Sequence, residues 1–164
     1  MSAAGKIDSL DAIAARLQAD RSQGKKVVLA NGVFDLLHVG HVRYLEAASR
    51  LGDLLVVAVN SDRSTRQMRG AGRPVVPQAE RAEVIGALRC VDHVLIFDEP
   101  DAVAVIRVLR PEVHAKGTDY TQLTVPERSE VQSYGGKVEI VGDAKRHSTS
   151  ELIERLANRD PRQA

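Results

Sequence analysis

The sequence is poor in aromatic residues: it has no tryptophan, two phenylalanines and three tyrosines among 164 residues. Proteins that bind single-stranded nucleic acid commonly stack bases on aromatic side chains, and this chain has few. Basic and acidic residues are nearly balanced, 23 against 22, so the formal net charge is only +1. Without a general positive field, we do not expect the chain to bind nucleic acid or an anionic membrane. A local anion site is still compatible with this balance.

Cysteine and long apolar runs are equally scarce. The single cysteine, Cys90, excludes an internal disulfide and a cysteine-cluster zinc site. It follows an apolar helical stretch, so we interpret it as a small buried residue. The N-terminal segment 1–17 carries charges every few positions and lacks the apolar core of a signal peptide. The longest apolar run, 54–59, is too short to cross a bilayer. These absences predict a soluble, cytoplasmic protein.

The rest of the sequence alternates short apolar runs with segments of helical periodicity. Such alternation is typical of a parallel sheet covered by helices on both faces. We therefore expect an α/β fold, a Rossmann-like three-layer αβα domain with a five-stranded parallel sheet in the order 3-2-1-4-5. The expected strands are 26–30, 54–59, 93–97, 113–115 and 137–141, and the expected helices are 8–17, 42–51, 77–88, 100–109, 126–133 and 151–157.

The length of 164 residues is that of one domain. We divide the chain into an N-terminal helical extension (1–24), a main domain (25–159) and a short tail (160–164). Segment 60–77 has no apolar periodicity and contains four arginines, so we predict an irregular, basic connection there.

Three polar segments follow expected strands: 31–41 after the first, 116–120 after the fourth and 143–150 after the fifth. In sheets of this kind, ligands bind at the carboxyl ends of the strands, where the strand order reverses. The three segments are therefore expected to converge on one site.

The first of these segments has two histidines three residues apart at the start of an expected helix. His38 and His41 flank Gly40, and Gly32 follows the first strand. A helix start offers backbone N–H groups and partial positive charge, which favour phosphate, and glycines permit close approach. Imidazole N–H groups can donate to phosphate oxygens as charge develops on them. The pair also fits a structural helix start or half of a zinc site, although no third ligand stands nearby at suitable spacing.

These residues resemble a known pattern. Segments Gly32–Asp35 and His38–His41 together resemble the GxFDxxHxGH signature of the cytidylyltransferase-like nucleotidylyltransferases. Ser148–Ser150, before the last expected helix, resembles the second signature of that superfamily. The resemblance covers about residues 26–157. It implies direct displacement on a nucleoside triphosphate without a covalent enzyme intermediate.

Further segments resemble one branch of the superfamily, the D-glycero-β-D-manno-heptose 1-phosphate adenylyltransferases, which make ADP-heptose for lipopolysaccharide and related glycans. The alternative branch, the glycerol 3-phosphate cytidylyltransferases, has an Arg-Thr-Glu-Gly run where this chain has Asp143–Arg146. The departure counts against CTP, although Lys145 and Arg146 offer positive charge from a shifted position. A non-catalytic nucleotide-binding module is a third hypothesis, against which the intact signatures count. The segments that resemble the heptose branch are 59–62, 69–70, 73–75, 81, 86–88, 91–92 and 116–120.

The resemblance also implies roles for individual residues. His38, His41 and Lys116 are expected to be catalytic, holding the phosphates and the reacting α-phosphorus. The expected nucleotide-binding residues are Gly32, Val33, Phe34, Asp35, Gly40, Gly117, Asp119, Tyr120, Ser148, Thr149 and Ser150, and the expected acceptor-binding residues are Asp62, Arg69 and Arg81.

Several of these roles have alternatives. Phe34 would pack in the core, Lys116 would reach the sugar phosphate or stay solvated, Asp62 would orient a neighbouring arginine or form a turn at the strand end, Asp119 and Tyr120 would form a plain turn, and Ser148 and Thr149 would only cap a helix. Asp35 would bind ribose, contact Mg²⁺ indirectly or cap its loop. Arg81 would bind the acceptor, pair at the surface with Glu80 or Glu83, or form a subunit contact. Mg²⁺ is expected to enter with ATP without dedicated protein ligands. The expected partners are ATP, a sugar 1-phosphate and further copies of the chain in a homodimer or higher homo-oligomer.

Overall fold

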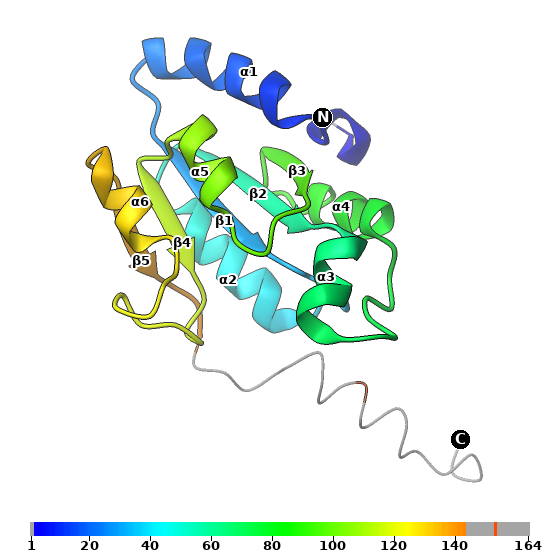
Figure 1. Ribbon diagram of the computed structural model, residues 1–164. Helices are drawn as coiled ribbons and strands as arrows, with labels where there is room; N and C mark the ends of the chain where they lie inside the picture. Colours follow the sequence, from blue (N-terminus) through cyan, green and yellow to red (C-terminus); the bar gives the residue numbers. More distant parts are fainter. Residues whose placement is uncertain (1, 144–152, 154–164) are drawn as a thin grey trace, which may run out of the picture.

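The computed structural model describes residues 2–143 and residue 153, which form a parallel sheet between layers of helices (Figure 1). The strands are β1 (Val27–Gly32), β2 (Leu54–Asn60), β3 (His93–Phe97), β4 (Val113–Lys116) and β5 (Lys137–Ile140). The helices are the 3-10 helix η1 (Ala3–Lys6) and the α-helices α1 (Leu10–Ser22), α2 (Val39–Ser49), α3 (Asp62–Arg69), α4 (Gln78–Gly86), α5 (Val103–Leu109) and α6 (Arg128–Ser133). The order β3-β2-β1-β4-β5, parallel throughout, confirms the predicted fold class.

Both faces of the sheet are buried, and alternate residues of a strand serve opposite faces. In β1, Val27 and Leu29 pack with α1, α5 and α6, whereas Val28 and Ala30 pack with α2 and α4. Figure 1 shows these two helical layers, with α1 and α5 on one side of the sheet and α2 on the other. Strands covered on both faces are largely apolar along their length, which explains the apolar runs without polar alternation in β1 and β2.

The register brings the carboxyl ends of the two central strands together. Ala30 of β1 lies beside Ala115 of β4, so Asn31 and Lys116 leave the sheet as neighbours. The chain runs from β1 outward to β3 and then returns to β4 on the other side of β1. The strand order therefore reverses between β1 and β4, the position where ligands bind in such sheets.

The prediction for segment 60–77 was wrong in part, because α3 occupies Asp62–Arg69. The hydroxyl of Ser61 caps this helix by accepting the N–H of Ser64 at 3.1 Å. The helix buries only Ser64 and Thr65, so it lacks the apolar stripe on which the prediction relied. The sequence did contain one signal for the start of this helix: Ser61 is a favourable N-cap residue, and Asp62 follows it in the first turn.

The N-terminal helix α1 contributes to the main core. Ile13 and Leu17 are fully buried in the cluster that includes residues of β1 and α5.

Cys90, interpreted from the sequence as buried, is only half-buried. Segment 144–152, with Ser148–Ser150, and the tail lie outside the described residues. Within the part of the chain that is described, no helix combines the length and apolar character needed to cross a membrane.

Candidate active site

The loop between β1 and α2 is shaped by close packing around Phe34. Phe34 is buried and has a left-handed backbone with φ 49°. Its ring stacks on Tyr44 of α2, with centroids 6.5 Å apart, and meets the His41 ring edge-on at 5.4 Å. A Cβ at Gly32 would lie 3.1 Å from the Phe34 ring, which explains the glycine there. The loop thus fixes where α2 begins.

The two histidines form the N-terminal cap of α2. The backbone N–H of Gly40 donates to Nδ1 of His38 at 3.2 Å, and the N–H of His38 donates to Nδ1 of His41 at 3.4 Å. The two rings stack with centroids 3.8 Å apart. Because both Nδ1 atoms accept hydrogen bonds, each neutral ring carries its proton on Nε2.

The electrostatic setting keeps His41 neutral. Burial, assisted by the neighbouring His38, lowers the pKa of His41 to about 4. A neutral imidazole with its proton on Nε2 is a hydrogen-bond donor without a full charge. The cap therefore serves two purposes at once, since it satisfies helix N–H groups and fixes the tautomer of both rings.

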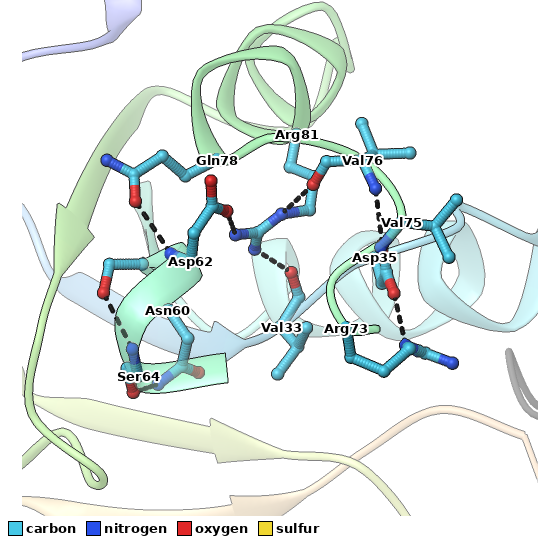
Figure 2. A network of polar contacts seen from close by, with 11 residues as sticks. Val33, Asp35, Asn60, Asp62, Ser64, Arg73, Val75, Val76, Gln78 and Arg81 are labelled. Atoms are coloured by element: carbon cyan, nitrogen blue, oxygen red, sulfur yellow. Dashed lines mark hydrogen bonds and ion pairs between the residues drawn. The ribbon is translucent and has the colours of Figure 1, made fainter. Parts of the chain in front are cut away.

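A polar network ties this loop to segment 73–76 (Figure 2). One carboxylate oxygen of Asp35 accepts the N–H groups of Val75 and Val76 at 2.8 and 2.9 Å, and the other pairs with Nε of Arg73 at 2.7 Å. The Asp35 side chain is 1% exposed. Three roles were considered for Asp35: binding ribose, contacting Mg²⁺ indirectly and capping its loop. These contacts fit the third role.

Arg81 completes the same network from α4. Its guanidinium donates to the carbonyl oxygens of Val33 and Val76 and pairs with Asp62 of α3 at 2.8 Å (Figure 2). The side chain is 0% exposed, so the alternative of a surface ion pair with Glu80 or Glu83 was wrong. Arg81 thereby joins α3 and α4 to the loop that carries the signature.

Lys116 lies at the end of β4 in a second buried cluster. Its Nζ is 3.1 Å from Oδ1 of Asn31 and 3.2 Å from Oε2 of Glu127, and it lies 4.7 Å from the centre of the Tyr120 ring. His114, fully buried on the same strand, contacts Oδ1 of Asn31 through Nε2 at 3.1 Å. The lysine predicted from the sequence therefore has polar neighbours that the sequence analysis did not single out.

The remaining predicted residues lie in different surroundings. Gly117, Asp119 and Tyr120 follow Lys116, with Tyr120 38% exposed. Arg69 is exposed at the last position of α3. The contacting residues that were assigned no role from the sequence are Asn31, Arg73, His114 and Glu127. Arg73 lies in a segment that resembles the heptose branch, whereas all four positions of β4 are buried and no local pattern marked His114 or Glu127.

The described residues contain no group of three or more histidine, cysteine or acidic side chains arranged to hold a metal ion. The loop between β1 and α2, residues 33–38, is called the signature loop below. Asp35 within it and Asp62 near it are each paired with an arginine. A divalent cation would therefore depend on ligands other than a cage formed by these carboxylates.

The strands of this parallel sheet have the order of an α/β protein of the nucleotide-binding type. A capped helix start and a buried lysine lie where the strand order reverses, which is where such proteins bind their ligands. The chain belongs to the cytidylyltransferase-like family, whose model matches residues 29–158. Membership confirms the resemblance predicted from the two signatures.

Curated relatives are similar over nearly the whole chain. The bifunctional protein HldE of Geotalea uraniireducens (strain Rf4) is 50% identical over 151 residues, which are 92% of this chain and 31% of that protein. HldE of Syntrophotalea carbinolica is 49% identical over 143 residues, 87% of this chain and 29% of that protein. The chain therefore spans about a third of the length of the curated relatives it matches.

Two solved structures share the fold. The lipopolysaccharide core biosynthesis protein from Thermoplasma volcanium GSS1 has a TM-score of 0.62 and 32% identity, covering 76% of this chain and 100% of that one. Pantoate-beta-alanine ligase from Francisella tularensis, complexed with beta-gamma ATP and beta-alanine, has a TM-score of 0.60 at 13% identity and covers 85% of this chain and 67% of that one. The second likeness concerns the fold alone.

Proposed function

We propose that this chain transfers AMP from ATP to D-glycero-β-D-manno-heptose 1-phosphate, giving ADP-D-glycero-β-D-manno-heptose and pyrophosphate for lipopolysaccharide core precursors. Family membership, about 50% identity to HldE proteins and the likeness to a lipopolysaccharide core biosynthesis protein support the proposal. The observation that carries it is the stacked pair of His38 and His41, whose Nδ1 atoms are occupied by the cap of α2.

The reaction is a single in-line displacement. An oxygen of the sugar 1-phosphate attacks the α-phosphorus of ATP, and the bond from that phosphorus to the oxygen bridging to the β-phosphate breaks as pyrophosphate leaves. The enzyme contributes positioning and charge stabilisation, because no covalent intermediate is needed. The Nε2–H groups of His38 and His41 donate to the α-phosphate oxygens, and Lys116 supplies a positive charge from the neighbouring strand.

The other predicted residues surround this centre in the proposal. The backbone of Gly32, Val33 and Phe34, with Gly40 at the helix start, would approach the triphosphate, and Ser148–Ser150 would bind its β- and γ-phosphates. Gly117, Asp119 and Tyr120 would face the ribose or the base, and Arg69 the acceptor. The buried contacts of Asp35, Asp62 and Arg81 support a different role, in which they hold the signature loop in place.

Mg²⁺ would accompany ATP, bound to phosphate oxygens and water rather than to a carboxylate cage. Its chemistry is to neutralise charge on the triphosphate. We also infer that the protein works in the cytoplasm as a homodimer or higher homo-oligomer, which sedimentation of the purified chain would test. The balanced net charge of +1 supports the absence of nucleic acid and membrane partners.

Pyrophosphate release tests the proposed function. The chain is assayed with ATP, Mg²⁺ and D-glycero-β-D-manno-heptose 1-phosphate, and in parallel with CTP and glycerol 3-phosphate. We expect release with the first pair alone and its loss in His41→Ala, whereas His93→Gln, a change on β3, retains activity. Release with the second pair would assign the chain to the alternative branch. Nucleotide binding without release from either pair would overturn the enzymatic proposal in favour of a binding module.

A further inference from the structure

The ammonium group of Lys116 is held by its neighbours on the sheet side. Oδ1 of Asn31 lies 3.1 Å from Nζ, and the Glu127 carboxylate lies 3.3 Å away through Oε1 and 3.2 Å through Oε2. The Tyr120 ring covers another side at 4.7 Å. The Lys116 side chain is only 6% exposed, so the contacts from Asn31 and Glu127 decide where its charge lies.

Glu127 has the features of a residue placed for this purpose. It precedes α6, and its side chain is 2% exposed. Besides Lys116, its carboxylate accepts the N–H of Ala102, at the start of α5, at 3.2 Å. A buried carboxylate is costly unless it is paired and hydrogen-bonded, and here one partner is the lysine itself. Glu127 thus links the lysine to a fixed point of the backbone.

Asn31 fixes the other side of Lys116. Its Oδ1 also accepts from Nε2 of His114 at 3.1 Å, which orients the amide with its oxygen toward the lysine. Burial, together with the positive charge of Lys116, lowers the pKa of His114 to about 4, so this ring adds no positive charge at neutral pH. The cluster therefore holds one positive and one negative charge.

We propose that Glu127, together with Asn31, is a positioning residue that keeps Lys116 protonated and fixed at the end of β4, with the Tyr120 side left for the approach of phosphate. This inference rests on the proposed function only in assigning the phosphate to that side. The contact with the Tyr120 ring is the exchangeable one, because a cation–π contact is worth less than a buried, hydrogen-bonded ion pair.

The charges that face Lys116 determine in which direction its pKa should move when Glu127 is changed. Burial lowers the pKa of Lys116 below its usual value, and Glu127 and the more distant Asp101 act in the opposite direction. Burial by itself would raise the pKa of Glu127, but the positive charge of Lys116, helped by the N–H of Ala102, outweighs it and the pKa falls below its usual value. Removing the negative charge at position 127 should therefore lower the pKa of Lys116 further.

The decisive variant is Glu127→Gln, which keeps the size and one acceptor oxygen but removes the charge. We expect the amine of Lys116, followed by nitrogen NMR of lysine side chains in the full chain, to titrate at least about one pH unit lower. The alkaline limb of the kcat profile should move down in pH by the same amount, with less change in KM for ATP. Glu130→Gln is the matched control, since Glu130 lies in α6, the helix that Glu127 precedes, and pairs with Arg107, whose side chain is 65% exposed. This control should shift neither the amine titration nor the kcat profile.

A second variant guards against loss of folding. Asn31→Asp adds a carboxylate beside Lys116 and should raise the pH at which its amine titrates. An unchanged titration in either folded variant would overturn the positioning role. Because the amine titration needs no turnover, it separates the two hypotheses: absence of turnover in the wild-type chain overturns the proposed function, and an unchanged titration overturns the role of Glu127.

Discussion

His114 is fully buried on β4, and burial with the nearby Lys116 lowers its pKa to about 4. The pKa of His41 is lowered to about 4 as well, by burial and by His38. Both rings are therefore neutral in the folded protein between about pH 4 and pH 7, whereas an unfolded histidine binds a proton near its usual pKa of about 6.5. The unfolded state consequently binds more protons in this range.

The first prediction concerns this difference in proton binding. Stability contributed by the neutral His114 is fully present above about pH 6.5 and declines as the pH falls toward about 4. The decline attributable to His114 is at most about 3 kcal/mol in the free energy of unfolding. Urea unfolding at about pH 7 and about pH 4.5 measures it, and His114→Gln should show a smaller loss between the two pH values than the wild type. Equal losses in both chains would show that His114 protonates freely in the folded state.

The histidines also show which site residues can be recognised from the sequence alone. His38 and His41 were singled out because their spacing around Gly40 matches a signature, and their shared cap confirms that they meet at the start of α2. Glu127 was not singled out, because a lone glutamate in a polar loop has no local pattern. The pairing of β1 with β4 brings Asn31 to Lys116, and only the return of the chain after β4 brings Glu127 to the same lysine.

At the scale of elements, Arg81 connects three segments that are distant in sequence. It is anchored on α4, pairs with Asp62 of α3 and donates to Val33 just after β1. The carbonyl of Val33 precedes Phe34, whose left-handed backbone turns the chain toward α2. Arg81 therefore determines how α3 and α4 lie relative to the signature loop.

The second prediction follows from the full burial of the Arg81 side chain, which pairs with Asp62. Arg81→Met leaves the Asp62 carboxylate and two carbonyl oxygens without their donor, and breaking a buried pair costs about 3–5 kcal/mol in the free energy of unfolding. Denaturant unfolding measures this cost. Arg63→Met is the matched control, because Arg63 pairs with Asp98 with both side chains more than half exposed, 68% and 55%. It should cost less than about 1 kcal/mol; similar losses in both variants would contradict the role assigned to Arg81.

At the scale of the molecule, α1 covers one face of the sheet. Ile13 and Leu17 are 0% exposed within the cluster formed with β1 and α5. Arg21, in the last turn of α1, pairs with Glu112 at 3.0 Å and donates to the carbonyl of Leu109. These contacts favour a helix that folds together with the main domain.

The third prediction tests this cooperation. Leu17→Ala should lower the free energy of unfolding by about 2–5 kcal/mol, because a fully buried side chain is removed and a cavity remains. A single unfolding transition should be retained if α1 and the sheet unfold as one unit. Leu123→Ala is the matched control, since Leu123 is 79% exposed and the same substitution there should change stability little. A small effect of Leu17→Ala, or a separate transition, would indicate an independent N-terminal segment.

The sequence by itself determined the five strands, their parallel arrangement and the two strand-end segments that carry Gly32, the histidines and Lys116, because apolar periodicity and local signatures act over short distances. It missed α3, whose polar surface gives no apolar periodicity, and it placed Arg81 at the surface as one alternative. Only the tertiary structure decided that Arg81 is buried against Val33, that Asp35 caps segment 73–76, and that Glu127 pairs with Lys116. Those contacts join loop residues to other loops, to β4 and to α4, and the free energy that selects them arises only when the sheet brings these segments together.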